Sequence, residues 1–139
     1  MSVEAFLWCY RLGENASMPV SQVLESFRPY TESFDTETDV LCLQFGGPEN
    51  SCDIYLGARA AQRGTTAGIS IARPLSEPKL WECVLEIMRR ETVILFFSDD
   101  TTPLYAAEEV LAHFPQELLQ SLGEPRQVAS PQDILASRT

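Results

Sequence analysis

Two adjacent aspartates and a single histidine are the side chains of this sequence with the clearest capacity for chemistry. Asp99 and Asp100 follow an apolar run, and acidic residues at the end of a buried strand often bind metal in open α/β sheets. The alternative, which the segment SDDTTP favours, is a turn in which carboxylates accept hydrogen bonds from backbone N–H groups. His113 lies near the end of an expected helix, where a partly solvated position is commoner than a catalytic base. A small hydrolase or ligand-binding enzyme using Asp99, Asp100 and His113 is therefore an alternative, not the favoured function.

The four cysteines form no recognisable metal or nucleophile motif. Cys9, Cys42, Cys52 and Cys83 include no CxxC pair, and one histidine is too few to complete a Cys/His zinc site. Three of them fall in expected strands and Cys83 in an expected helix, which indicates buried, reduced thiols. Neither a glycine-rich phosphate loop nor a GxSxG elbow is present. We therefore expect no cofactor, no metal and no catalytic residue, and favour a protein that is not an enzyme.

The elements that would position these side chains are clearest between residues 76 and 100. Ser76 suits a helix N-cap and Pro78 the first turn, and apolar residues then recur at spacings of three and four up to Arg90. The run VILFF that follows is apolar on both faces, which predicts a strand in the middle of a sheet.

Weaker patterns predict the rest of the fold. Alternation predicts strands over 3–10, 40–45, 52–56 and 66–72, the last three as an antiparallel meander. Helical spacing and turn residues predict helices over 19–27, 108–114 and 116–122, a last helical turn after Ser130, and brief strands at 104–106 and 127–129. The polar segment 31–39 is expected to be held to the body by Phe34 alone.

Strand, helix and strand follow one another over 66–97, which favours a right-handed crossover between parallel strands. We expect a single α+β domain over residues 1–139. Its sheet is expected to be mixed, mainly antiparallel and of about five or six strands, with helices packed against it.

Charge separates this chain from an average globular protein. Twenty acidic and ten basic residues give a net charge of −10, which disfavours nucleic acid and anionic membrane surfaces as partners. The N-terminus is a poor signal peptide, and no segment approaches the roughly 20 apolar residues of a membrane span. Together with reduced cysteines, these features predict a cytoplasmic protein whose permitted partner is a basic protein.

Acidic residues are concentrated between positions 32 and 53. We expect them to share one negative surface that binds a basic partner, with two further aspartates at one end of it. A solvated loop is the alternative. The expected partner-binding residues are Glu32, Asp35, Glu37, Asp39, Glu49, Asp53, Asp99 and Asp100.

The C-terminal half resembles a class of bacterial proteins. The order LWECVLEIMRR, TVILFF, SDDTTPLY and AHFPQELLQSLGEPRQVASPQDI is similar to that of small single-domain proteins, some of which act as immunity proteins in polymorphic or contact-dependent toxin systems. The resemblance implies a small, acidic, cytosolic, non-catalytic protein that covers a toxin's active site, and it assigns no site residue. The leading expectation is therefore an acidic protein-binding module that neutralises a basic toxin domain. A subunit of a protein assembly, using the aromatic face of Phe6, Trp8 and Tyr10, is a further alternative.

Overall fold

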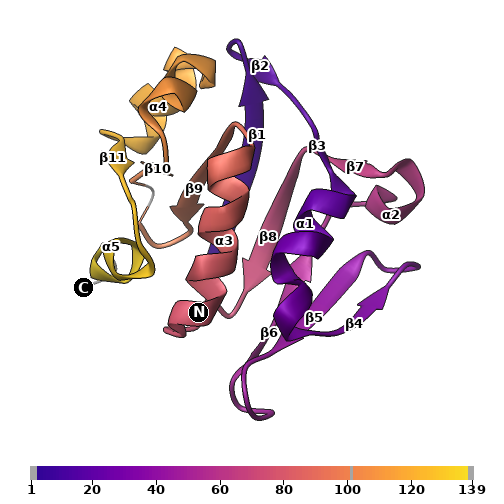
Figure 1. The fold of residues 1–139 in the computed structure, drawn as a ribbon. Helices are drawn as coiled ribbons and strands as arrows, with labels where there is room; N and C mark the ends of the chain where they lie inside the picture. Colours follow the sequence, from indigo (N-terminus) through magenta and orange to yellow (C-terminus); the bar gives the residue numbers. More distant parts are fainter. Residues whose placement is uncertain (1–2, 101, 138–139) are drawn as a thin grey trace.

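In the computed structural model of this protein, the N-terminal strand lies in the middle of one large sheet. β1 (Glu4–Arg11) pairs antiparallel with β8 (Gly68–Ala72) on one side and with β9 (Val93–Phe97) on the other. Because both neighbours run antiparallel to β1, they are parallel to each other, and α3 (Pro78–Arg90) connects them across it. The predicted crossover unit is therefore present, with β1 inserted between its two strands (Figure 1).

The side of the sheet beyond β8 is an antiparallel meander, as predicted. β6 (Ser51–Tyr55) pairs with β8, β5 (Val40–Gln44) pairs with β6, and β4 (Thr31–Asp35) pairs with β5 as the edge strand. The polar segment that contains β4 was not expected to form a strand, so β4 corrects the sequence analysis. An edge strand pairs on one side only, and β4 keeps four of its five side chains exposed, which leaves little apolar pattern to detect.

Short strands complete the sheet beyond β9. β10 (Leu104–Tyr105) pairs with β9, and β11 (Arg126–Gln127) runs parallel to β10. Within the residues that the structure describes, 3–100 and 102–137, six strands have five residues or more. The predicted mixed, mainly antiparallel α+β fold is confirmed. The remaining strands are β2 (Glu14–Asn15), paired with β1, and β3 (Met18–Pro19), paired with β7 (Thr65–Thr66).

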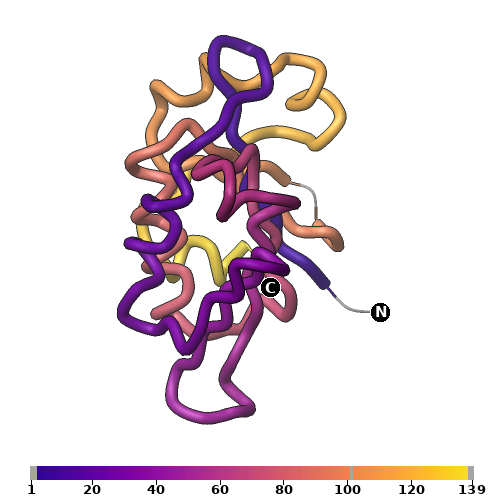
Figure 2. The backbone as a smooth tube through the Cα atoms, turned by 90° about the vertical axis from the view of Figure 1, so that its right-hand side faces the viewer, coloured from indigo at the N-terminus to yellow at the C-terminus, as the bar shows by residue number. Residues whose placement is uncertain are grey.

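Helices pack on one face of the sheet (Figure 1). α1 (Val20–Phe27) and α3 pack side by side on this face, and α5 (Pro131–Ala136) packs on α3 (Figures 1 and 2). Trp81 of α3 is buried here, and its indole N–H donates to the Leu75 carbonyl at 2.8 Å. All five residues of β9 are buried, as the run of apolar residues predicts. Two shorter helices complete this part of the fold, η1 (Arg28–Tyr30) and α2 (Ala60–Arg63).

The N-cap of α3 differs by one residue from the prediction. The capping residue is Glu77, whose carboxylate accepts a hydrogen bond from the Lys79 N–H at 3.2 Å, and not Ser76. A hydrogen bond from the Asn50 amide, together with the one from Lys79, favours the ionised form and holds the pKa of Glu77 below its ordinary value.

The opposite face of the sheet is covered only in part. η2 (Glu108–His113), a 3-10 helix where an α-helix was predicted, and α4 (Gln116–Leu122) enclose a second apolar cluster. This cluster contains Tyr10 and Ile94 of the sheet and Val110 and Phe114 from the covering segment. None of the helices within residues 3–100 and 102–137 is long and apolar enough to cross a membrane.

Candidate protein-binding face

An aromatic row crosses the face of the sheet that is turned away from α1 and α3. The register places Phe96, Phe6, Ser70 and Tyr55 beside one another across β9, β1, β8 and β6. Trp8 lies two residues further along β1, and its ring meets Phe96 edge-on, with 4.7 Å between the ring centroids. Trp8 is 38% exposed and Tyr55 44% exposed, although aromatic side chains of this size are usually buried.

Gly68 allows the Trp8 ring to lie close to the sheet. The two residues are register partners on β8 and β1. A Cβ atom at position 68 would lie 2.8 Å from Cδ1 of the indole and 2.8 Å from the backbone oxygen of Leu7. The indole therefore packs against bare backbone on one side and against Phe96 on another, which fixes its orientation.

An acidic row borders the aromatic row on the side nearer the beginning of β1. Glu4, Ala72, Asp53, Cys42 and Ser33 are register partners in that order across five strands. The spacing along a strand puts this row about 7 Å from the aromatic one. Neither row contains a lysine or arginine, so the two rows combine exposed aromatic rings with negative charge. We call Glu4, Phe6, Trp8, Asp53, Tyr55 and Ser70 the open face.

Three of the predicted partner-binding residues lie on or beside the open face. Asp53 belongs to it, and Glu32 is exposed on β4 next to Ser33, the last member of the acidic row. Asp35 ends β4, and its carboxylate accepts hydrogen bonds from the N–H groups of Glu37 at 2.9 Å and of Thr38 at 3.4 Å. These hydrogen bonds lower the pKa of Asp35. Glu37 itself is exposed in the turn after β4.

Asp39 does not contribute to a surface. It is only 6% exposed, and its carboxylate accepts hydrogen bonds from the backbone N–H groups of Arg59 and Ala61, each at 2.8 Å. This buried carboxylate holds the start of α2, which corrects the expectation that all the acidic residues of this segment share one surface.

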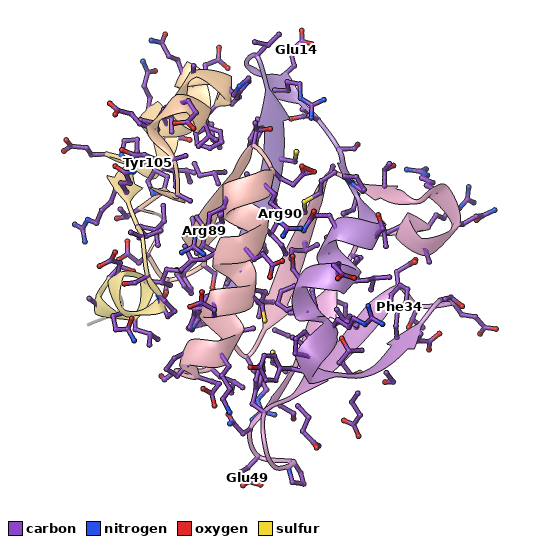
Figure 3. The ribbon with its side chains drawn as sticks, viewed as in Figure 1. Glu14, Phe34, Glu49, Arg89, Arg90 and Tyr105 are labelled. Carbon is purple, nitrogen blue, oxygen red and sulfur yellow. The ribbon has the colours of Figure 1, made fainter. Side chains whose placement is uncertain are left out.

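Glu49 lies apart from the acidic residues of β4. It belongs to the β5–β6 turn, at the opposite end of β5 from the turn that contains Glu37. Figure 3 shows Glu49 at the tip of this turn, well away from Phe34 on β4. A single surface that includes every predicted acidic residue is therefore not formed.

Asp99 and Asp100 lie in the turn after β9, which starts where the Ser98 N–H donates to the Glu4 carbonyl at 2.8 Å. Asp100 accepts hydrogen bonds from the N–H and the hydroxyl of Thr102, as in the turn favoured above. His113 lies at the other end of β9, five residues or roughly 17 Å away, where its Nδ1 accepts a hydrogen bond from the Leu12 N–H. The fold does not bring these three side chains together, and no group in the described residues has the composition of a metal site.

All four cysteines are free thiols. Burial raises the pKa of Cys52 and of Cys83 to about 12, so both stay protonated at neutral pH. Cys42 departs from the predicted burial, because it lies half-exposed in the acidic row. A hydrogen bond with Ser33 lowers the pKa of Cys42, but burial and the neighbouring Asp53 outweigh it, so the pKa is raised overall. A neutral thiol is a poor nucleophile.

Sequence reasoning missed Glu4, Ser70 and Tyr55 as members of a face. Their outward orientation follows from alternation along β1, β6 and β8, and this was the available signal. That alternation does not show which outward positions are covered by η2 and α4 and which remain uncovered.

Comparison with known protein families, curated proteins and solved structures found no match to this chain. A proposal for its function therefore rests on the residues of the open face and their geometry.

Proposed function

We propose that this protein is a non-enzymatic binding module that docks a basic protein on the open face. The observation that carries the proposal is the exposure of Trp8 and Tyr55 beside Glu4 and Asp53 on a face without lysine or arginine. Exposed aromatic side chains typically anchor protein interfaces, and a negative surround speeds association with a basic partner and selects for it.

The net charge of −10 supports a basic partner over a second copy of this chain. Two copies that met through the open face would bring like charges together, which opposes self-association. The assembly-subunit alternative also included Tyr10, but that side chain is 8% exposed and packs against Phe114. A monomer in solution is the expected state.

The kind of partner that we propose is a basic toxin domain, with this protein as its immunity protein. A cytoplasmic location is part of the proposal, and four free thiols are consistent with a reducing compartment. The hydrolase alternative has less support, because Asp99 and Asp100 are separated from His113 by the length of β9.

Co-expression with the product of the neighbouring reading frame tests the proposal. A purified complex should weaken steeply as salt rises, because the negative face contributes to association. The double variant Trp8→Ser/Tyr55→Ser should weaken binding at least about a hundredfold, because it removes two interface anchors.

A matched pair of variants separates the face from net charge. Glu4→Gln/Asp53→Asn removes two charges from the open face, whereas Glu117→Gln/Glu124→Gln removes two exposed charges around α4. The first pair should weaken binding about tenfold more than the second. Equal effects, or no complex with this product, would count against the proposed function.

A further inference from the structure

The two tryptophans of this chain have opposite roles. Trp81 is 1% exposed, and its indole N–H is satisfied by the Leu75 carbonyl. Trp8 is 38% exposed, and no residue in the described part of the chain accepts a hydrogen bond from its indole N–H. A ring that Gly68 and Phe96 hold in place, and that stays 38% exposed, is built like an interface anchor.

A cleft lies beside Trp8. Its volume is about 330 Å³, and its walls include Tyr10, Asn15, Gly68 and Ser70. The side chains of Asn15 and Ser70 make no hydrogen bond within the described residues, so their oxygen atoms are available as acceptors. None of the residues that line the cleft is charged, and an aromatic ring forms one of its walls.

The lining suits a planar group with several N–H donors, and the net charge of −10 favours a cationic one. A carboxylate would find no cation in the cleft, and a purely aliphatic side chain would leave the oxygens of Asn15 and Ser70 desolvated without partners. A guanidinium group carries five N–H donors in one plane, which suits neutral oxygen acceptors. It also stacks on an indole ring more readily than an ammonium group does. The net charge of −10 adds a long-range attraction for it.

We infer that the cleft beside Trp8 receives an arginine side chain of the partner, stacked on the indole and hydrogen-bonded to Asn15 and Ser70. This inference rests on the proposed function and deepens it, because it names the partner residue that the open face selects.

A titration with N-acetyl-arginine methylamide, followed by amide and indole NMR signals, tests the inference without any partner protein. The arginine compound should cause saturable shifts of the Trp8 indole signal and of the Asn15 and Ser70 amides, while the signal of the buried Trp81 indole stays unchanged. The matched citrulline compound has nearly the same shape but no charge, and it should bind about tenfold more weakly.

Two variants locate the binding. Trp8→Leu should abolish the saturable shifts, and Ser70→Leu, which fills the cleft and keeps the indole, should do the same. Leu12→Ser removes an apolar side chain that is 79% exposed and outside the cleft, and it should leave the titration as in the wild type. The inference is overturned if the arginine compound gives no saturable shift, or if the citrulline compound matches it.

The two proposals can fail separately. If a complex with the neighbouring gene product depends on Tyr55 and Glu4 but the arginine compound does not bind, the protein-binding function stands and the arginine site falls. If the arginine compound binds and no complex forms, the site stands and the proposed function falls.

Discussion

The imidazole of His113 accepts a hydrogen bond at Nδ1 from the backbone N–H of Leu12, with 3.1 Å between the two nitrogens. The His113 carbonyl also accepts a hydrogen bond from the Gly13 N–H at 3.0 Å. The single histidine of the chain therefore ties the turn after β1 to η2, the segment that covers Tyr10 and Ile94. Its position near the end of a helix agrees with the sequence analysis, and its geometry gives it a structural role.

Replacing His113 by leucine should loosen this turn. We expect the Leu12 amide to exchange with solvent about tenfold faster, which corresponds to the loss of one hydrogen bond. Asparagine can present an oxygen near the position of Nδ1, so His113→Asn should retain most of the protection. Hydrogen exchange followed by NMR at one fixed pH measures both variants, and equal exchange in His113→Leu and wild type would contradict the role.

Gly68→Ala should destabilise the protein and move the Trp8 ring. The added Cβ would meet the Leu7 carbonyl oxygen and the indole at 2.8 Å, and the backbone contact cannot be relieved by rotating a side chain. We expect a loss of about 1–3 kcal/mol in the free energy of unfolding, measured by urea denaturation, and a changed near-UV circular dichroism signal. Ser70→Ala, at the next outward position of β8, serves as the control and should change neither. An unchanged denaturation midpoint for Gly68→Ala would show that the sheet absorbs the methyl group.

Asp39→Ala should be among the most damaging changes of an acidic residue. It removes both acceptors for the Arg59 and Ala61 N–H groups, and it places alanine at a positive φ of 59°. We expect a loss of about 2–4 kcal/mol in unfolding free energy, and a smaller loss for Asp39→Asn, which keeps one oxygen and tolerates this backbone conformation. Glu37→Ala in the same turn should stay within about 0.5 kcal/mol of wild type. Similar losses for Glu37→Ala and Asp39→Ala would refute the assignment.

Stability should fall in alkaline solution because of buried thiols, above all those of Cys52 and Cys83. The ordinary thiol pKa of 9.0 is raised to about 12 in folded Cys52 and Cys83, so below pH 9 both are protonated whether the chain is folded or unfolded. Between pH 9 and about 12 the thiols ionise only in the unfolded chain. Each can then lower the unfolding free energy by up to about 1.4 kcal/mol per pH unit.

Urea denaturation at several pH values above 9 measures this loss. The variant Cys52→Ala/Cys83→Ala should show a shallower decline with pH, whatever its stability at pH 8. Cys42→Ala keeps the buried thiols of Cys52 and Cys83 and should retain most of the decline. A double variant that declines as steeply as wild type would assign the loss to other groups.

The elements that the sequence predicted well are those with a strong local pattern. The VILFF run identifies β9, and the spacing of apolar residues up to Arg90 identifies α3. A strand buried on both faces needs apolar residues throughout, and a helix buried on one side needs them along one stripe, so both patterns are visible in the sequence. β4 has one large apolar residue, Phe34, and its pairing with β5 is set by the backbone, so no local pattern distinguishes it from a loop.

The candidate site was less predictable, because it depends on contacts between distant segments. Nothing near Asp39 in the sequence indicates that Arg59 and Ala61, twenty and more positions away, donate their N–H groups to it. Likewise, alternation in β1 identifies an aromatic face, but the covering of Tyr10 and the exposure of Trp8 are decided by η2 and α4, a hundred residues later.

The central position of β1 sets the order in which this chain can fold. Ala5 pairs with Ile71 on one side and with Phe97 on the other, so β1 leaves the ribosome well before either neighbour and cannot complete both pairings until Phe97 has been synthesised. Contacts of such long sequence separation slow folding, because the intervening chain must be ordered before they form. During this interval the nascent chain displays Phe6 and Trp8 on an unpaired strand, which is the kind of segment that chaperones shield.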